Sequence, residues 1–396
     1  MAANVLFIMT DQQRFDTTQT LGADGLYTPN LDRLVERGIS FLNAYSTCPV
    51  CVPAPCTIRT GCEPPTTRIF TNVPSAAVPG QAPTVTGSCG DYLARTMGAL
   101  GYRTFGIGKF HTHPWDEDLG YEVHVDTEEL CGDVDQRIRD AYARRIRENL
   151  PAYGHVEQLH GERTDMYYMP QTSPFPAEHI VGSFVADRAV EQIARDDGRP
   201  FFGFVLFIGP HPPFAPPVPC NRMYNPDRMP TPVHGDRTTN HMDEHLPWMN
   251  HLIWAEDVRD SLARVLWARY YGEITYIDAC IGRVLDGVEA RADADDTTIC
   301  FFSDHGDHMG HHHSWQKESF FEQSCHIPFL VSRPSRLATG TPALRDGIDV
   351  IGCLSGESAG RTEPRSRPDG EAGPPGPRAA GRRGRGLQEI TRPRTS

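Results

Sequence analysis

The segment PFFGFVLFIG, residues 200–209, decides the fold class. It is an unbroken apolar run, and such a run is typical of a strand that is covered on both faces, as in a parallel sheet between layers of helices. The polar segment PHPPF follows directly at residues 210–214. We therefore predict a buried strand that ends in a loop able to carry functional groups.

Three other segments repeat this pattern of an apolar strand followed by a polar loop. They are residues 4–9 before TDQQ, residues 104–108 before KFHTH, and residues 297–303 before DHGDH. Helical patterns are predicted at residues 29–38, 90–101, 181–195 and 257–290, and a further strand at residues 39–45. This alternation predicts an α/β domain with a largely parallel sheet. The four polar loops should then converge at one edge of the sheet, where such folds bind ligands.

Length and composition limit the class of protein. The chain has 396 residues, 39% of them hydrophobic and 22% charged, as expected of an ordinary globular protein. Its formal net charge of −13 argues against nucleic acid and anionic membranes as partners, so an anionic substrate would need a locally positive pocket. No run reaches the roughly 18 apolar residues of a membrane span. Residues 4–9 lack the basic flank of a signal peptide, and the eleven cysteines are odd in number, so we expect a cytoplasmic protein with reduced thiols.

The end of the chain differs from the rest in composition. From Gly352 onward, 45 residues include nine Gly, six Pro and nine Arg, and none is aromatic. Such a segment cannot bury a core, so residues 353–396 are predicted to be a disordered tail or a stretch read out of frame; a genuine flexible basic tail is the alternative. Residues 1–352 then form the folded domain. Its long irregular insertions, at about 111–180 and 215–255, should shape a pocket or its lid.

Carboxylates and a histidine follow two of the predicted strands. Asp11 and Gln12 come directly after the first strand, and Asp304 and His305 end a strand almost 300 residues later. Oxygen ligands with one imidazole suit Ca²⁺, Mn²⁺ or Mg²⁺ better than a structural zinc ion. The alternative is that these residues only cap helices or form turns at the strand ends.

Cationic candidates follow the other strands. Lys109 and His111 lie in GKFHTH, His211 lies in PHPPF, and Lys317 lies in HSWQK after the carboxylate loop. Each could be a surface residue or a satisfied core residue. Their shared position at strand ends favours a pocket for an anion.

A cluster of cysteines offers two further readings. Cys48, Cys51, Cys56 and Cys62 have the spacing C-x2-C-x4-C-x5-C, which lacks the paired knuckles of common zinc sites. A cysteine nucleophile of the protease kind would need a histidine partner held beside it in the fold.

Taken together, these segments resemble the formylglycine-dependent sulfatases of the alkaline-phosphatase-like superfamily, in the branch of bacterial arylsulfatases and phosphonate monoester hydrolases. The matching segments are NVLFIMTDQQRFD (4–16), TPNLDRLVERGISFLNAY (28–45), TCPVCVPAPCTIRTG (47–61), GYRTFGIGKFH (101–111), PFFGFVLFIGPHPPF (200–214), YYGEITYIDACIGRVLD (270–286) and TTICFFSDHGDHMGHHHSWQKESFFE (297–322). The resemblance implies a three-layer α/β/α sandwich with its catalytic domain in residues 1–352. The small C-terminal subdomain usual in the family is expected to be missing.

The resemblance also implies a role for each candidate residue. The metal ligands would be Asp11, Gln12, Asp304, His305 and the modified Cys51. Catalytic contacts with the sulfate or the leaving oxygen would come from Cys51, Lys109, His111, His211 and Lys317, and substrate would be bound by Asn72, Lys109, His211 and Lys317. The ion would be one divalent cation, with Ca²⁺ as the family default and Mn²⁺ as the alternative that suits an imidazole ligand.

The nucleophile implied by the resemblance is made after translation. A formylglycine-generating enzyme would oxidise Cys51 to an aldehyde, whose hydrate attacks sulfur with one hydroxyl and expels sulfate through the other. The substrate would be a small anionic ester. Sulfate esters are the first expectation, and phosphonate monoesters or phosphodiesters are the alternative. The sequence carries no signal for an oligomeric state.

One residue departs from the family signature Cys-x-Pro-x-Arg. Cys51 and Pro53 are in register, but Pro55 stands in place of the arginine that helps the modifying enzyme and buttresses the nucleophile. Proline has no charge and no donor, although it is tolerated at a helix start. Arg59 lies one turn beyond and is a distant substitute. Two functional classes follow, which are an active hydrolase and a catalytically inactive relative.

Overall fold

In a computed structural model of the protein, the apolar segment at residues 200–209 forms strand β5 (Phe201–Phe207), and all seven residues of the strand are buried. The structure describes residues 2–72, 91–112, 117–128, 138–153, 167–235 and 244–335, together with the backbone of 343–345 and 348–349. These residues all belong to one compact unit, Met1–Ser358. The predicted tail at 353–396 lies outside the described residues.

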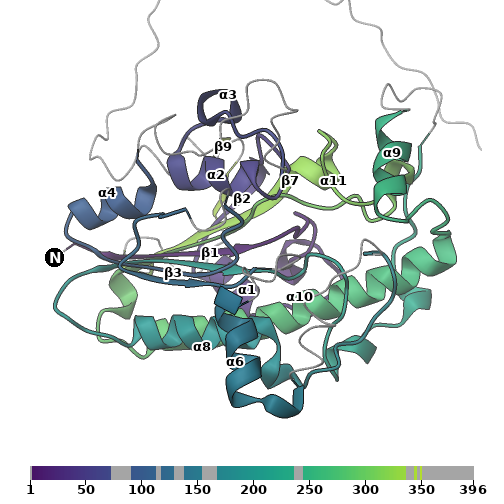
Figure 1. The fold of residues 1–396 in the computed structure, drawn as a ribbon. Coiled ribbons are helices and arrows are strands. Elements are labelled where there is room, and N and C mark those ends of the chain that lie inside the picture. Colours follow the sequence, from purple (N-terminus) through teal and green to yellow (C-terminus); the bar gives the residue numbers. More distant parts are fainter. Residues whose placement is uncertain are drawn as a thin grey trace, which may run out of the picture. The chain divides into compact units, whose positions relative to one another are not determined.

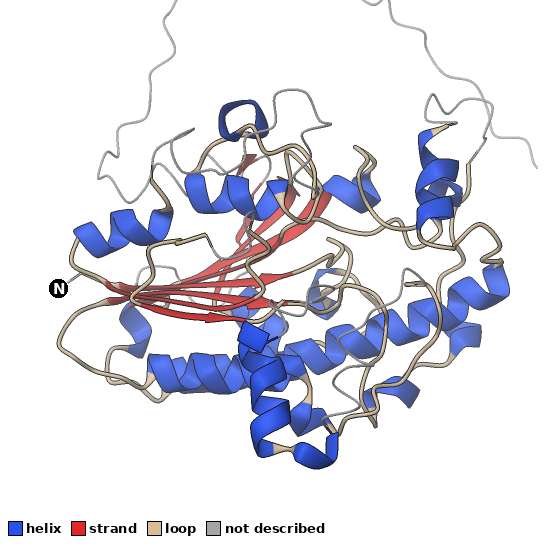
Figure 2. Cartoon of the chain, in the orientation of Figure 1, coloured by secondary structure: helices blue, strands red, loops and turns tan. Residues whose placement is uncertain are grey.

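The described strands form a single mixed sheet that is mostly parallel (Figure 2). Besides β5, they are β1 (Asn4–Thr10), β2 (Gly38–Tyr45), β3 (Arg103–Gly108), β4 (Val123–Asp126), β6 (Thr297–Ser303), β7 (His326–Ser332), β8 (Ala343–Arg345) and β9 (Ile348–Asp349). Their order is β4-β3-β5-β1-β6-β7-β2-β8, and β9 also pairs with β2. Strand β7 runs antiparallel to both of its neighbours. The prediction of a largely parallel sheet is confirmed.

Strand register brings the polar loops to one edge of this sheet. Thr10, the last residue of β1, pairs with Phe207 of β5 on one side and with Ser303 of β6 on the other. Gly108 at the end of β3 pairs with Leu206. Because the neighbouring strands end level with one another, the residues that follow β1, β3, β5 and β6 emerge side by side.

Helices cover both faces of the sheet (Figure 1). On one face lie α1 (Pro29–Glu36), α6 (Ala141–Asn149), α8 (Val181–Ile193) and the long α10 (Asp260–Glu289). On the other lie α2 (Pro53–Thr60), α3 (Pro64–Thr67) and α4 (Leu93–Ala99), with α9 (His245–Leu252) and α11 (Glu322–Cys325) toward the site edge. Two buried apolar clusters, one on each face, join the helices to the sheet. The result is the predicted three-layer α/β/α arrangement.

The two predicted irregular insertions are less irregular than their sequence indicates. Residues 111–180 contain β4 and α6, and residues 215–255 contain α9, so that part of the prediction is wrong. Strand β4 has only four residues, none of them fully buried, so its apolar pattern is too short to read. Strand β7 carries Pro328 where the β2 pairing shifts register, which hides a central strand. No helix among the described residues is long and apolar enough to cross a membrane.

Candidate active site

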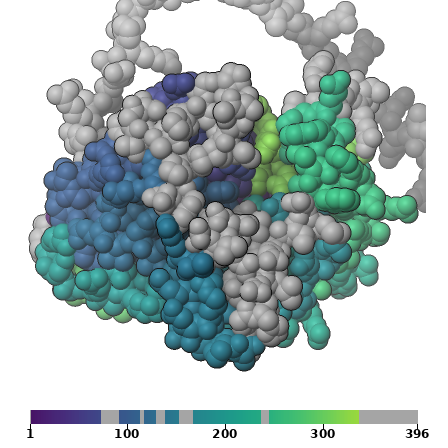
Figure 3. Space-filling view, in the orientation of Figure 1, coloured from purple at the N-terminus to yellow at the C-terminus, as the bar shows by residue number. Residues whose placement is uncertain are grey.

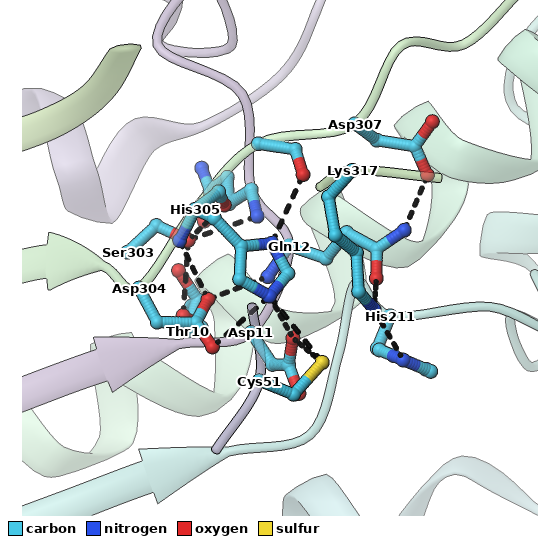
Figure 4. Close-up of polar contacts among 12 residues, drawn as sticks. Thr10, Asp11, Gln12, Cys51, His211, Ser303, Asp304, His305, Asp307 and Lys317 are labelled. Atoms are coloured by element: carbon cyan, nitrogen blue, oxygen red, sulfur yellow. Dashed lines mark hydrogen bonds and ion pairs between the residues drawn. The ribbon is translucent and has the colours of Figure 1, made fainter. Parts of the chain in front are cut away.

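Three ligand-type side chains meet where β1 and β6 end (Figure 4). Asp11, Asp304 and His305 each place a carboxylate oxygen or ring nitrogen within 4.8 Å of the other two, and all three are buried. The peptide N–H of Asp304 donates to the Thr10 carbonyl, so the two strand ends are tied together. The register of two neighbouring strands therefore builds this cluster from residues almost 300 positions apart.

His305 presents a lone pair to the cluster. Its Nδ1 lies 3.0 Å from the Gly306 carbonyl oxygen, which can only accept, so Nδ1 carries the proton. The unprotonated Nε2 then lies 3.4 Å from Asp304 Oδ2 and 3.6 Å from Asp11 Oδ1. Burial, followed by the charge of Lys317, lowers the pKa of His305 to about 3. Three acceptors that face one another in this way suit a divalent cation with oxygen and imidazole ligands.

The two carboxylates of the cluster differ in their electrostatic surroundings. Burial works to raise the pKa of Asp11, but Lys109, with further help from His211, His305 and Lys317, holds it below its usual range. Burial and then the charge of Asp11 raise the pKa of Asp304. Two buried carboxyl groups this close repel each other, and a bound cation would relieve that repulsion.

Lys109 is placed by the end of β3. Its ammonium forms a buried salt bridge with Asp11. The preceding Gly108 has a φ of 116°, and a Cβ there would lie 1.8 Å from the Leu206 carbonyl oxygen, so only glycine permits this turn. The loop is fastened further by Glu128, which accepts from the peptide N–H groups of Phe110 and His111.

His111 lies in the same loop, two residues beyond Lys109. Its backbone has a φ of 45°, in the left-handed region, and the side chain is half-buried. It is not among the described residues that line the pocket holding Cys51. Its predicted contact with substrate therefore stays a prediction.

Gln12 connects the cluster to the second lysine. Its backbone is left-handed, with a φ of 66°, and is held by a bond from its N–H to Asp304 Oδ1 and by one from the Tyr270 hydroxyl to its carbonyl. Its amide oxygen accepts from Lys317 Nζ at 2.7 Å, and its amide nitrogen donates to Asp307 Oδ2 at 2.5 Å. A non-glycine residue in this conformation persists only where its surroundings fix it, as they do here.

His211 and Lys317 form the second cationic group. Lys317 Nζ lies 3.2 Å from His211 Nε2, and His211 Nδ1 lies 2.6 Å from the Pro212 carbonyl oxygen. The carbonyl accepts, so Nδ1 carries the proton and Nε2 accepts from the ammonium. A ring nitrogen of His211 also lies within 4.8 Å of a carboxylate oxygen of Asp11 and of Cys51 Sγ. The lysine, the histidine and the cluster are therefore contiguous.

Cys51 lies beside the cluster, two residues before α2. Its Sγ is 3.3 Å from His305 Nε2 and 3.9 Å from Asp11 Oδ1, and the side chain is buried. Burial and then the charge of Asp11 raise the pKa of this thiol, so an unmodified Cys51 is a poor thiolate nucleophile. The next peptide N–H, of Val52, donates to Asn72 Oδ1, which places Asn72 beside the cysteine. Its predicted contact with substrate stays a prediction.

The zinc alternative for the cysteines is excluded. Among the described residues, the groups of three or more close histidine, cysteine or acidic donors are both at the Asp11 cluster, and Cys48, Cys56 and Cys62 belong to neither. All of the described cysteines are free thiols.

Pro55 and Arg59 both lie in α2 and are buried. Pro55 is the third residue of the helix, where a missing N–H is tolerated, so the fold accepts the departure from the signature. The guanidinium of Arg59 donates to the Phe110 carbonyl and lies over the Phe110 ring, 5.8 Å from its centre. Arg59 thus supports the loop that carries Lys109.

A pocket of about 180 Å³ opens onto Cys51. Its polar lining includes Asn72, His211, Gln316, Lys317 and Glu318, and its apolar lining comes from Tyr167 and from Met249, Leu252 and Ile253 at the end of α9. Figure 3 shows α9, in green, standing at the surface beside the light-green segment that carries α11. The pocket therefore has a cationic floor and an apolar wall.

Sequence reasoning missed two buried residues that contact Gln12. Asp307 lies three residues after Asp304 in the same DHGDH segment, so its position was a usable signal. Tyr168 comes from the first insertion, where nothing in the local sequence marks it. Its hydroxyl donates to Asp307 Oδ2 at 2.5 Å and accepts from the Gln316 N–H at 2.9 Å.

Comparisons with known proteins agree on one family, the sulfatases. The sulfatase family model matches residues 3–351. A multifunctional alkaline phosphatase superfamily protein, PehA, from Trinickia caryophylli is 31% identical over 363 residues, which cover 83% of this chain and 68% of that protein. An arylsulfatase from Clostridium perfringens is 28% identical over 360 residues, covering 86% and 70%. The crystal structure of the phosphonate monoester hydrolase of Agrobacterium radiobacter superposes with a TM-score of 0.70 at 23% identity, covering 89% of this chain and 72% of that one, and so shares the fold.

Proposed function

The chain belongs to the sulfatase family, and on that premise we propose that it is a metal-dependent hydrolase of small sulfate esters, similar to arylsulfatases, with residue 51 as its nucleophile. One observation carries the proposal. The acceptors of Asp11, Asp304 and His305 converge beside Cys51, at a pocket into which the buried Lys317 projects. This arrangement provides a place for a cation, a nucleophile and a cationic receptor for the ester oxygens.

The cation would be held by Asp11, Gln12, Asp304 and His305, with Ca²⁺ as the first expectation and Mn²⁺ as the alternative. Such an ion would withdraw charge from the sulfate oxygens and lower the pKa of a nearby hydroxyl. The lone pair that His305 Nε2 presents, and the charge repulsion between Asp11 and Asp304, support this assignment.

Residue 51 would act after a formylglycine-generating enzyme has oxidised it. One hydroxyl of its aldehyde hydrate would attack sulfur and displace the alcohol of the ester. The second hydroxyl would then lose its proton and expel sulfate, which restores the aldehyde. The position of Cys51 Sγ, 3.3 Å from His305 Nε2, supports a role for this side chain at the cation site. Asn72, bonded to the Val52 N–H, holds the backbone just after the nucleophile.

The remaining residues would bind and orient the ester. Lys317 donates to Gln12 and His211 and faces the pocket, so its ammonium can also meet a sulfate oxygen. The proton that Lys317 Nζ directs at His211 Nε2 would be the one passed to the departing alkoxide. Lys109 would keep Asp11 ionised and oriented. The apolar wall from α9 would receive the organic part of the substrate.

Hydrolysis of phosphonate monoesters is the second candidate. Gln12 and His305 stand at ligand positions where the phosphonate branch of the family has the same residues, although some sulfatases share them. A phosphonate monoester carries one negative charge, as a sulfate monoester does, so the charges of the pocket do not separate the two. An inactive relative is the third possibility, and Pro55 in the signature supports it.

Three measurements test these proposals together. The protein is produced in a host with the modifying enzyme, and the mass of the tryptic peptide Gly38–Arg59 is measured by mass spectrometry to detect an aldehyde at residue 51. The same preparation is assayed on 4-nitrophenyl sulfate and on a 4-nitrophenyl phosphonate monoester, before and after treatment with EDTA and re-addition of Ca²⁺ or Mn²⁺. A converted peptide with metal-dependent sulfate release supports the proposal, and preference for the phosphonate selects the second candidate. An unmodified cysteine without turnover selects the inactive relative.

A further inference from the structure

We propose that Asp307, assisted by Tyr168, is the positioning residue that fixes which end of the Gln12 amide faces the cation site. The inference rests on the proposed metal site, and it concerns a residue to which the metal-site assignment gives no role. Asp307 is fully buried, and it contacts neither the pocket nor the three-acceptor cluster directly. Its influence on the site is through Gln12 (Figure 4).

Without Asp307, either end of the Gln12 amide could face Lys317. The oxygen and nitrogen ends of a glutamine side chain are nearly equal in size, so shape alone does not select between them. Only the oxygen end can bind a cation or accept from an ammonium. A Gln12 amide turned the wrong way would present its N–H₂ group to the Lys317 ammonium, and that contact would become repulsive.

The hydrogen bonds around Asp307 remove this ambiguity. Its carboxylate meets donors, with Met309 N–H at 2.7 Å on Oδ1 and the Tyr168 hydroxyl at 2.5 Å on Oδ2. The Tyr168 oxygen accepts from the Gln316 N–H and, at 3.3 Å, from the Gln12 amide nitrogen, so its proton is left for Asp307 Oδ2. Oδ2 therefore offers only an acceptor to Gln12, and the amide nitrogen must turn toward it.

The consequence reaches the pocket in two steps. With the nitrogen held by Asp307, the Gln12 oxygen faces Lys317 Nζ at 2.7 Å. Lys317 in turn donates to His211 Nε2, and His211 belongs to the close group formed with Asp11 and Cys51. A single buried carboxylate thus sets the direction of every hydrogen bond along this path, from Asp307 through Gln12 and Lys317 to His211.

The first variant to make is Asp307→Asn, which keeps the shape and introduces one N–H₂ group. If that group takes the Oδ1 position it opposes the Met309 N–H, and if it takes the Oδ2 position it forces the Gln12 amide to reverse. We expect the affinity for Ca²⁺ or Mn²⁺, measured by calorimetry, to fall about 10- to 100-fold, as for other residues that orient metal ligands. Asp278→Asn is the matched control, since it also replaces a buried carboxylate that accepts from backbone N–H groups, and its metal affinity should stay unchanged.

A reciprocal exchange separates positioning from a general structural role. Gln12→Glu alone would place two carboxylates face to face and should also weaken cation binding. Gln12→Glu combined with Asp307→Asn restores complementarity. The asparagine N–H₂ then donates to one oxygen of the carboxylate introduced at position 12, and the other oxygen of that carboxylate still accepts from Lys317. The double variant should recover metal affinity to within about fivefold of the wild type, whereas two independent structural defects would add.

The outcomes are distinguishable. Weak binding in both single variants with recovery in the double variant supports the inference. Wild-type affinity in Asp307→Asn, with its fold verified by circular dichroism, would overturn it and leave the metal site standing. Equal weakening in the single and double variants would also overturn it and would assign Asp307 a structural role. A wild-type protein that binds neither ion would overturn the metal site itself and this inference with it.

Discussion

Two eight-residue helices on opposite faces of the sheet begin alike and then differ in what meets their first turn. Both α1 and α2 start with proline, at Pro29 and Pro53. In α1, the peptide N–H groups of Asn30 and Leu31 donate to the buried carboxylate of Asp278 in α10. In α2, the N–H groups of Ala54 and Cys56 are taken by backbone carbonyls, and Pro55 has none to offer. The start of α1 is therefore an occupied anion site, and the start of α2 offers an anion little.

This difference shows where the site obtains its positive charge. A helix start beside a nucleophile is a ready source of N–H donors for an oxyanion, but prolines 53 and 55 remove two of them here. The family arginine would have added a cation at position 55, and it is absent. A bound sulfate would then depend on Lys109, Lys317, His211 and a metal ion. The contribution of α2 reduces to the position of residue 51.

The strongest test of that statement is Cys51→Ala. We expect sulfate ester hydrolysis to fall by about 10⁴-fold or more, because no other side chain can replace the nucleophile. Cation affinity should fall, because residue 51 is one of the five expected ligands, but binding should persist through Asp11, Gln12, Asp304 and His305. Calorimetry with Ca²⁺ beside the 4-nitrophenyl sulfate assay measures both quantities. Loss of cation binding would show that α2 contributes more than a nucleophile.

The second test restores the missing charge with Pro55→Arg. We expect the fraction of residue 51 converted to the aldehyde to rise, with activity increasing roughly tenfold or more in proportion. Pro55→Ala is the matched control, because it returns the N–H without the guanidinium and so separates the two losses. Mass spectrometry of the peptide that contains residue 51 gives the converted fraction. Full conversion in the wild type would show that proline at this position is no obstacle.

Much of this architecture was predictable because strand burial leaves a plain pattern. The runs at 4–9, 200–209 and 297–303 are apolar on both faces, and the residues after them meet because parallel strands end level. The candidate residues Asp11, Lys109, His211 and Asp304 were placed at one edge of the sheet in this way.

Other features depended on contacts that no local pattern reports. Tyr168 reaches Asp307 from an insertion 139 residues away, and its sequence neighbours carry no periodicity. Arg59 lies on the expected helix but turns to Phe110, a choice that only the packed loop decides. Strand β4 is too short to show a period, and Pro328 masks β7. Short or interrupted elements are specified by their neighbours in the fold, so their own sequence predicts them poorly.

A smaller effect is expected from Arg59→Met, which removes the guanidinium held by the Phe110 carbonyl. The Lys109 loop should loosen, lowering kcat/KM about fivefold through misplacement of Asp11 and its lysine. The carbonyl left without its donor should lower the free energy of unfolding by about 1–3 kcal/mol. Arg59→Lys, which keeps a donor, should recover part of both losses. Unchanged kinetics in the methionine variant, measured on the folded protein, would mean that Glu128 alone holds the loop.

The smallest effect on activity, and a direct test of the contrast between the helices, is expected from Asp278→Asn. Burial raises the pKa of Asp278 to about 6, against the N–H groups of Leu31 and Asn30, which lower it. A raised pKa means that the folded protein holds the proton more tightly than the unfolded chain. The contribution of Asp278 to the stability of the folded protein is therefore full below about pH 4, and it is lost as the pH rises through about 6.

Urea unfolding of the wild type and of Asp278→Asn at pH 5 and pH 7.5 measures this contribution. Between these values the wild type should lose about 1–2 kcal/mol of stability relative to the variant, and turnover should be equal in both. If the free energy of unfolding of the wild type instead rises relative to that of the variant as the pH rises, the N–H donors at the start of α1 affect the pKa of Asp278 more than its burial does. The first turn of α1 would then be a strong anion site, and the loss of such donors at α2 would cost the enzyme correspondingly more.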